Sequence, residues 1–237
     1  MIGYDGAGGV STLGLESGGE IGDFLCSTHR QLLFFLGFDL WDFVRYGFEQ
    51  FPMIREIVQY GDPVLRQRCR PVTEVDDSII GLVADMLDTM AHANGVGLAA
   101  PQVGEDVRLA MVDVSHDPEC ISFLKVNGED ANLEEIMPLI FINPELEFGQ
   151  AKEFGMEGCL SIRGIRSEVR RPETVRATLP QLDGSVLVVE TDGLLARALQ
   201  HEVDHLNGVL FVDRLAAVAK VSMKNRLKRL LESGGEG

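Results

Sequence analysis

Two stretches of the chain repeat their apolar residues every three or four positions, which is the spacing of a helix with one buried face. The first runs from Asp76 to Asn94, and Asp76 can cap its start. The second runs from about Gly193 to Leu206, where Thr191 or Asp192 can act as the cap. Both patterns predict helices that pack on a hydrophobic core.

Other parts of the chain predict strands and one further helix. Four short stretches are rich in β-branched residues and are bounded by Pro, Gly and Asp, which is typical of strands: Arg108–Val114, Leu139–Asn143, Glu173–Leu179 and Val186–Glu190. The end of the chain, Asp213–Ser233, predicts a helix. Its apolar residues are Leu215, Val218, Leu227 and Leu230.

The first fifty-two residues follow neither pattern. Residues 3–22 are rich in Gly and Ser, which indicates a flexible or disordered segment. Leu32–Phe51 is rich in aromatic residues and acidic, so it is a poor targeting signal. We therefore expect residues 1–52 to be an extension, partly disordered or the product of a start codon placed too early, with Met53 as the true initiator. Residues 53–237 are expected to form the folded domain.

Composition narrows the classes of function. A net charge of −16 argues against nucleic acid as the main ligand, so we expect no specific DNA partner. No run of eighteen apolar residues is present, so no membrane-spanning segment is predicted. The four cysteines form no C-x-x-C pair, which indicates a reducing compartment and a cytoplasmic protein.

The pentad His201-Glu202-Val203-Asp204-His205 is the first candidate for chemistry. On a helix, residues four apart share one face, so both imidazoles can reach one metal ion beside the Glu202 carboxylate. In one group of metalloproteases a third histidine follows, but Phe211 occupies that place. Because a catalytic metal needs three protein ligands, the third ligand must lie upstream.

Two glycine-containing segments upstream carry further candidates. Glu157–Ser161 places Cys159 in a tight turn, where a thiolate can bind Zn²⁺ or Fe²⁺, although a buried cysteine is also an ordinary core residue. Gly95–Gln102 has glycines that allow close approach of a ligand, and the Gln102 amide can donate a hydrogen bond. Its G-x-G-x-x-A spacing lacks the βαβ context of a dinucleotide site.

Together these three segments resemble the peptide deformylase family, whose motifs are G-φ-G-φ-A-A-x-Q, E-G-C-φ-S and Q-H-E-x-D-H, where φ is hydrophobic. All three are complete and in the family's order, and the resemblance runs from about Met53 to the C-terminus. It implies an α+β fold with antiparallel sheets packed around a central helix that carries the pentad, plus a C-terminal helix. It also implies a metal-dependent hydrolase that removes the N-formyl group from formylmethionine of nascent polypeptides and releases formate. A zinc endopeptidase is the nearest rival class.

The resemblance also assigns roles to residues. The metal, one ion per chain, would be Fe²⁺, with Zn²⁺, Ni²⁺ or Co²⁺ as replacements, and its ligands would be Cys159, His201 and His205. Glu202 would deprotonate the attacking water and protonate the leaving amine. The oxyanion would be met by the Gln102 amide and the Leu160 N–H. The residues that would bind substrate are Gly97, through the peptide backbone, and Val96, Leu194 and Ala198, around the methionine side chain. Gln200 and Asp204 are expected to be structural.

Some features depart from the family pattern or extend it. Arg163 stands where proline is usual, which bears on substrate preference at the rim of the peptide groove. Residues 115–137 are longer than the family's usual connection and are expected to be a surface insertion with a polar turn at Asn127–Asp130. The basic residues of the C-terminal helix suggest either a solvated face or contact with the ribosome.

Overall fold

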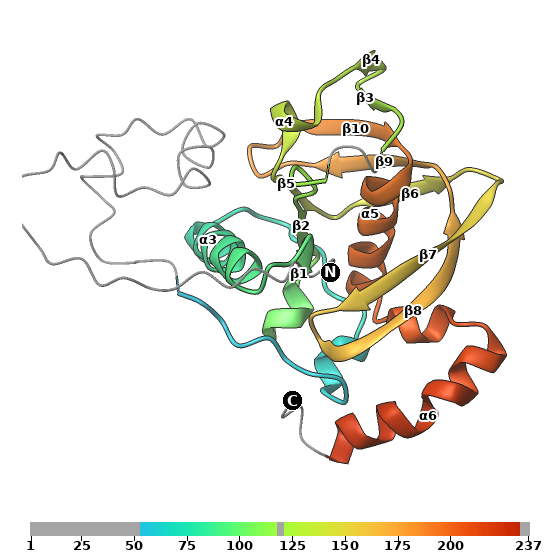
Figure 1. The fold of residues 1–237 in the computed structure, drawn as a ribbon. Coiled ribbons are helices and arrows are strands. Elements are labelled where there is room, and N and C mark those ends of the chain that lie inside the picture. The colour runs from blue at the N-terminus through green and yellow to red at the C-terminus, as the bar shows by residue number, and fades with distance from the viewer. Residues whose placement is uncertain (1–52, 118–120, 233–237) are drawn as a thin grey trace, which may run out of the picture. The chain divides into compact units, whose positions relative to one another are not determined.

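A computed structural model describes residues 53–117 and 121–232, which lie in one unit of the chain, Pro52–Gly237. Residues 1–52, for which the sequence predicts an extension, lie outside the described residues. In the described part, three antiparallel sheets pack around one helix, α5 (Gly193–Leu206), as Figure 1 shows. The expected α+β fold is therefore confirmed. No helix among these residues is long and apolar enough to cross a membrane.

Two of the three sheets contain all four predicted strands. The smaller sheet has the order β1-β2-β5, and the larger has the order β4-β3-β10-β9-β6. The strand bounds are β1 Gly97–Ala99, β2 Leu109–Val112, β3 Leu124–Val126, β4 Glu129–Asp130, β5 Leu139–Ile142, β6 Glu145–Phe148, β9 Val175–Pro180 and β10 Val186–Thr191. The predicted strands are β2, β5, β9 and β10, and each is confirmed to within two residues at either end.

The third sheet is the hairpin of β7 (Lys152–Cys159) and β8 (Ile162–Pro172). Buried and exposed residues alternate along β8, so that Val169 and Arg171 point inward. The pairing register shifts between Gly158 and Cys159. This irregularity places Cys159 directly before the tight connection to β8.

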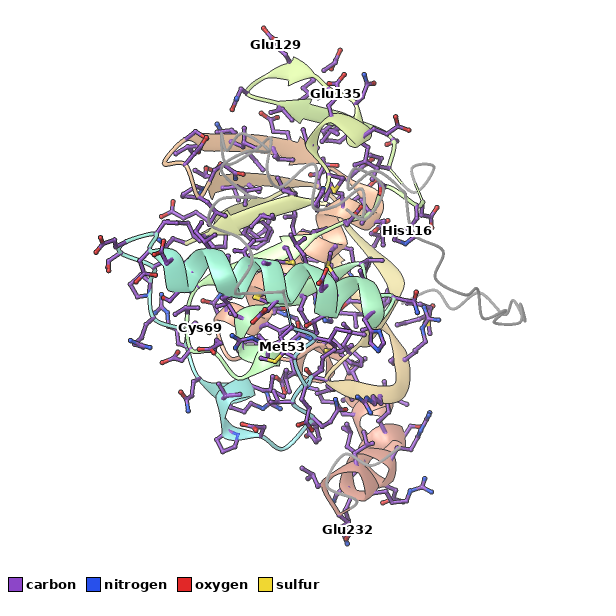
Figure 2. All side chains as sticks on the ribbon, turned by 90° about the vertical axis from the view of Figure 1, so that its left-hand side faces the viewer. Met53, Cys69, His116, Glu129, Glu135 and Glu232 are labelled. Carbon is purple, nitrogen blue, oxygen red and sulfur yellow. The ribbon has the colours of Figure 1, made fainter. Side chains whose placement is uncertain are left out.

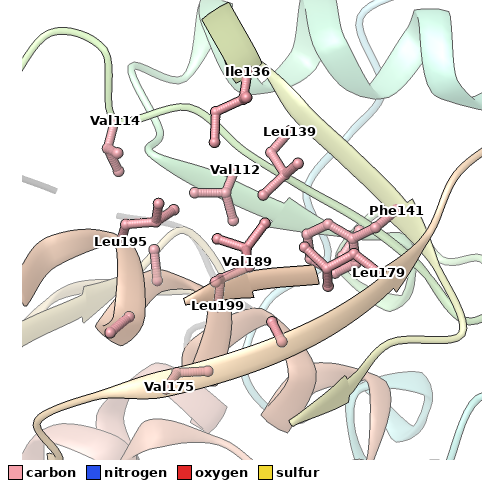
Figure 3. Packing of buried hydrophobic residues seen from close by; sticks show 14 of the residues in the cluster. Val112, Val114, Ile136, Leu139, Phe141, Val175, Leu179, Val189, Leu195 and Leu199 are labelled. Atoms are coloured by element: carbon pink, nitrogen blue, oxygen red, sulfur yellow. The ribbon is translucent and has the colours of Figure 1, made fainter. Parts of the chain in front are cut away.

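The main hydrophobic core fills the space between α5 and the two larger sheets (Figure 3). Leu195 and Leu199 of α5 are fully buried there, together with Val112 of β2 and Val189 of β10. Each such aliphatic side chain contributes about 1.5–3 kcal/mol by leaving water. The core thus holds the helix that carries the pentad in a fixed place.

The helices begin and end close to where the sequence predicts. Helix α3 (Asp77–His92) starts after Asp76, whose Oδ1 accepts the Ile79 N–H at 3.1 Å. Its last turn is followed by Asn94 in the left-handed region, at φ 50°. Helix α5 follows Asp192, but this residue makes no capping hydrogen bond with its side chain. The Asp192 carboxylate instead accepts the Ser122 N–H at 2.8 Å.

The segment predicted to be a surface insertion, 115–137, is only partly at the surface. The turn at Asn127-Gly128 is exposed, and both residues have positive φ. However, β3 pairs with β10 inside the larger sheet, and helix α4 (Leu133–Ile136) buries its two terminal residues in the main core. The prediction is therefore wrong for the flanks of the turn, because their apolar residues complete the core.

Helix α6 (Ala217–Glu232) lies at the end of this unit opposite the β3–β4 hairpin, as the positions of Glu232 and Glu129 in Figure 2 show. None of its residues is fully buried. One face, formed by Ala219, Met223, Leu227 and Leu230, packs on a second hydrophobic cluster with Leu65, Phe211 and Leu215. Val218, predicted to be on the apolar face, is 83 % exposed. Two short 3-10 turns, η2 (Pro63–Arg66) and η5 (Phe211–Arg214), contribute Leu65 and Phe211 to this cluster, and β8 contributes Ile162, Ile165 and Val169.

Candidate metal and catalytic site

The structure brings the three predicted metal ligands together. His201 and His205 lie one turn apart on α5, and Cys159 ends β7. One ligand atom from each residue can be chosen so that all three lie within 4.8 Å of one another, and Cys159 Sγ is 3.2 Å from His205 Nε2. Cys159 and His205 are buried, so the three residues do not form an exposed surface cluster.

The surroundings of the three residues suit a cation. Burial acts to lower the pKa of His201, but hydrogen bonds with Cys159 and Glu157 outweigh it and raise that pKa to about 10. Burial, and then the nearby His201, lower the pKa of His205 well below its usual value. A thiolate with two imidazoles is a donor set for Fe²⁺ or Zn²⁺, and a divalent ion would supply the positive charge that this position favours.

Glu202 lies on the same helix with its carboxylate in a dry environment. It is 3 % exposed, and its Oε2 is buried without a hydrogen-bond partner among the described residues. Burial raises the pKa of Glu202 to about 7, against the opposing charges of His201 and Arg171. A carboxyl group that titrates near neutral pH can both accept and return a proton.

Glu157 connects the predicted ligand His201 to two buried arginines. Its Oε2 lies 3.0 Å from His201 Nδ1 and accepts Arg171 Nη2 at 2.8 Å. Its Oε1 accepts Arg171 Nε at 2.6 Å and Arg197 Nη1 at 2.9 Å. With Nδ1 bonded to Glu157, the Nε2 of His201 is left for a metal. Sequence reasoning assigned no role to Glu157, Arg171 or Arg197. Arg171 and Arg197 could have been noticed as cations at inward positions of β8 and α5.

The two residues expected to be structural make contacts of that kind. Asp204 accepts Arg171 Nη1 at 2.8 Å and Arg214 Nε at 2.8 Å. Gln200 Nε2 donates to the carbonyl oxygens of Pro172 and Ala196, each at 3.0 Å. Neither side chain makes a hydrogen bond with Cys159 Sγ among the described residues.

Gln102 is oriented so that its donor faces the ligand sulfur. It lies in the 3-10 turn η3 (Ala100–Val103), and its Oε1 accepts the Ala99 N–H at 2.9 Å. That bond directs Nε2 toward Ser161 Oγ at 3.3 Å and Cys159 Sγ at 3.6 Å. The amide therefore points an N–H toward the space beside Cys159 Sγ.

The segment Ile57–Tyr60 joins the loop of Gln102 to the turn of Leu160, and sequence reasoning missed this. The Val58 N–H donates to Gln102 O at 2.9 Å, and the Tyr60 N–H donates to Ser161 O at 2.7 Å. Gln59 Nε2 reaches Leu160 O at 3.3 Å. No motif marks such backbone contacts, because any residue type except proline can make them.

The four predicted substrate-binding residues lie close to α5 and β1. Ala198 is buried in the main core, and Val96 and Leu194 pack against it while partly exposed. Gly97 lies on β1, next to the Glu202 side chain. The side chains of Val96, Leu194 and Ala198 therefore contribute to the packing of the core. Because Val96 and Leu194 are partly exposed, a ligand can also reach them.

Phe211 marks the difference from the metalloprotease arrangement. Its ring stacks on His201, with the centroids 6.1 Å apart and the planes 26° from parallel. Phe211 is 1 % exposed and so covers one side of the ligand helix. The position that would carry a third histidine therefore provides packing instead of a ligand.

Comparisons with known proteins agree on one family. Residues 54–221 match the family model described as polypeptide deformylase. The chain is 44 % identical over 178 residues to a peptide deformylase of Methylacidiphilum infernorum, covering 75 % of this chain and 93 % of that protein. A Clostridium botulinum peptide deformylase is 44 % identical over 161 residues, with 68 % and 96 % covered.

Solved structures give the same match. The structure of a Synechococcus elongatus peptide deformylase in complex with actinonin has a TM-score of 0.60 and 37 % identity, covering 77 % of this chain and 87 % of that one. A Legionella pneumophila peptide deformylase has a TM-score of 0.63 and 34 % identity, with 78 % and 99 % covered.

Proposed function

Because the chain belongs to the polypeptide deformylase family, and is therefore a metal-dependent hydrolase that removes the N-formyl group of nascent polypeptides, we propose that Cys159, His201 and His205 hold its metal ion. The observation that carries this assignment is the convergence of the three ligand atoms within 4.8 Å on buried elements. We propose one ion per chain, Fe²⁺, with Zn²⁺, Ni²⁺ or Co²⁺ as replacements, because thiolate and imidazole ligands accept each of these ions. Metal analysis of protein purified without oxygen tests the identity of the ion.

Glu202 acts as the general base and acid. When bound, a divalent ion lowers the pKa of water and polarises a carbonyl oxygen. Glu202 takes the proton of the water that attacks the formyl carbon and gives it to the departing amine nitrogen. Its pKa of about 7 suits both transfers, because the carboxylate gains and loses a proton at little cost near neutral pH.

Gln102 and the backbone N–H of Leu160 stabilise the negative charge that develops on the formyl oxygen. The orientation of Gln102 by the Ala99 N–H supports this role, since its donor is set before substrate arrives. The hydrogen bond from Gln59 Nε2 to the Leu160 carbonyl oxygen helps to fix the loop that carries the second donor, the Leu160 N–H. Removing one such donor typically lowers kcat by about 10²–10³.

The formylated peptide binds along β1 and the first turns of α5. Gly97 contacts the peptide backbone, while Val96, Leu194 and Ala198 line the space for the methionine side chain. Arg163, which is exposed next to the Leu160–Ser161 turn, lies at the rim of this groove. The catalytic unit in this proposal is residues 53–237.

Formate release from formyl-Met-Ala-Ser tests the proposal directly. Metal-replete protein is expected to release formate, and Glu202→Gln is expected to release none while it keeps its metal. Loss of metal in Glu202→Gln would show that a ligand has been misassigned. Cleavage of internal peptide bonds would favour an endopeptidase, a reading that the packing of Phe211 does not support.

We also propose that α6 contacts the ribosome and that the enzyme works in the cytoplasm. The five basic side chains on α6 are exposed in a chain whose net charge is −16: Lys220, Lys224, Arg226, Lys228 and Arg229. Such a helix can bind RNA phosphates, with an affinity that falls as salt rises. The described cysteines outside and inside the site, Cys69 and Cys159, are free thiols, in keeping with a reducing compartment.

Ribosome co-sedimentation at low salt tests the contact. Lys224→Glu with Arg229→Glu is expected to weaken co-sedimentation, whereas the matched pair Lys125→Glu with Lys152→Glu, on β3 and β7, is expected to leave it intact. Unchanged co-sedimentation of both the α6 double variant and a chain truncated after Leu215 would contradict the contact. Formate release by the charge variants would show that the site itself is unaffected.

A further inference from the structure

The backbone of β1 lies directly against the carboxylate of Glu202. A Cβ atom added to Gly97 would sit 2.4 Å from Glu202 Oε1, 2.9 Å from Cδ and 3.0 Å from Cγ. Gly97 does not have a positive φ, and it pairs with Val112 in an ordinary antiparallel register. A residue with a side chain could therefore adopt this backbone conformation. Lack of space, and not backbone geometry, requires glycine here.

Packing is the main restraint on the Glu202 side chain. Its Oε2 has no hydrogen-bond partner among the described residues, although Glu202 is only 3 % exposed. The Glu157 carboxylate has no hydrogen to donate to Glu202, and it instead makes its hydrogen bonds with the arginines and His201. A base that must both take and release a proton is better placed by contact than by a strong donor, which would stabilise only its charged form.

We propose that Gly97 is a positioning residue whose bare Cα forms the wall that holds the Glu202 carboxylate in its reactive place. This role is separate from the contact of Gly97 with the peptide backbone. It rests on the proposed role of Glu202 as general base and acid.

The expected effect of Gly97→Ala follows from the distances. An ordinary C···O contact is about 3.3–3.6 Å, so the new methyl group would push Oε1 away by about 1 Å. A displacement of that size at a reacting group can lower kcat about 10²-fold. The fold is expected to survive, because the displaced atoms are the end of a flexible side chain and not backbone. Metal content is expected to stay that of the wild type, since no ligand moves.

A crystal structure of Gly97→Ala and its steady-state kinetics test the proposal. The structure is expected to show the Glu202 carboxylate displaced, and the kinetics a fall in kcat with little change in KM. An undisplaced carboxylate, or a rise in KM with kcat preserved, would overturn the proposal. The second result would mean that Gly97 acts through the peptide alone.

A double variant makes the distinction sharper. Glu202→Asp already withdraws the carboxylate from its reactive place by one methylene, so a methyl group on residue 97 can no longer displace it from that place. Gly97→Ala added to Glu202→Asp is therefore expected to cause no further loss of kcat. If the losses of the two single variants multiply instead, the residues act independently and the proposal fails.

The same series separates this inference from the proposed function. Glu202→Gln is measured beside the other variants. If it keeps wild-type turnover, the proposed role of Glu202 is wrong. If it is inactive while Gly97→Ala leaves the carboxylate in place, only the positioning role of Gly97 is wrong.

Discussion

Replacing Arg171 by methionine is expected to destabilise the protein strongly, because it leaves two buried carboxylates short of a partner. The Arg171 side chain is 3 % exposed and bonds to Glu157 through Nε and Nη2 and to Asp204 through Nη1. Removing one member of a buried ion pair typically costs about 3–5 kcal/mol. Arg197 still contacts Glu157 and Arg214 still contacts Asp204, so we expect the lower end, about 3 kcal/mol.

The assay is thermal and urea unfolding of wild type and variant in the same metal state. For a domain of this size, about 3 kcal/mol lowers Tm by about 6–12 °C. The matched control is Arg176→Met, because the Arg176 side chain is 46 % exposed and pairs with Glu147 at 3.3 Å. An exposed pair contributes about 0–1 kcal/mol, so this control is expected to stay close to wild type.

Acid dependence gives the same prediction a second measurement. Burial acts to raise the pKa of Glu157, but hydrogen bonds from Arg171 and His201 outweigh it and hold that pKa well below its usual range. A lowered folded pKa means stability that is present above the unfolded value of about 4.3 and is lost as pH falls. The difference between wild type and Arg171→Met is therefore expected to shrink below about pH 4. If Arg171→Met matches Arg176→Met at pH 7, the buried network does not stabilise the fold as argued.

Three further predictions concern the site. Replacing Cys159 with alanine is expected to lower metal content below about a tenth of an ion per chain, because two imidazoles alone bind weakly; metal analysis measures this. Gln102→Leu is expected to lower kcat about 10²-fold with little change in KM, and an unchanged kcat in the formate assay would exclude its oxyanion role. In metal-free protein the raised pKa of Glu202, about 7, makes stability fall as pH rises from about 4 to 7. Metal-free Glu202→Gln is therefore expected to exceed metal-free wild type by about 3 kcal/mol at pH 8 and to equal it at pH 4, as urea unfolding would show.

The helices were predictable because their signals are local. The apolar spacing and the Asp76 cap define α3 from adjacent residues, and α5 has the predicted bounds, Gly193–Leu206. The cap of α5 shows the limit of this reasoning. Asp192 stands in the right place, but its carboxylate bonds to Ser122, seventy residues earlier in the chain. A side chain with two possible partners is decided by tertiary structure.

Among the strands that sequence reasoning missed, β3 and β4 have the weakest pattern. They are only three and two residues long, and their register depends on the neighbouring strand, β10 for β3 and β3 for β4, and not on their own sequence. The buried arginines were missed for a similar reason. A charged residue at an inward position interrupts the hydrophobic pattern of a strand or helix, and its burial cannot be predicted until its partner is known. The three motifs, by contrast, predict the ligands, the base and the amide, because the chemistry requires those residue types at fixed spacing.

The position of Glu157 connects the buried ion pairs to the proposed metal site. Its carboxylate accepts from Arg197 of α5 and Arg171 of β8 while it orients His201. Arg171 continues to Asp204, which in turn holds Arg214 of η5. The helix, the hairpin and the turn before α6 are thus joined by one chain of charged groups, which is buried except at Arg214, and His201 is one of its members. Orienting groups of this kind typically affect metal affinity about 10–100-fold. Arg171→Met is therefore expected to lower metal affinity as well as stability, whereas loss of a purely structural contact would lower stability alone.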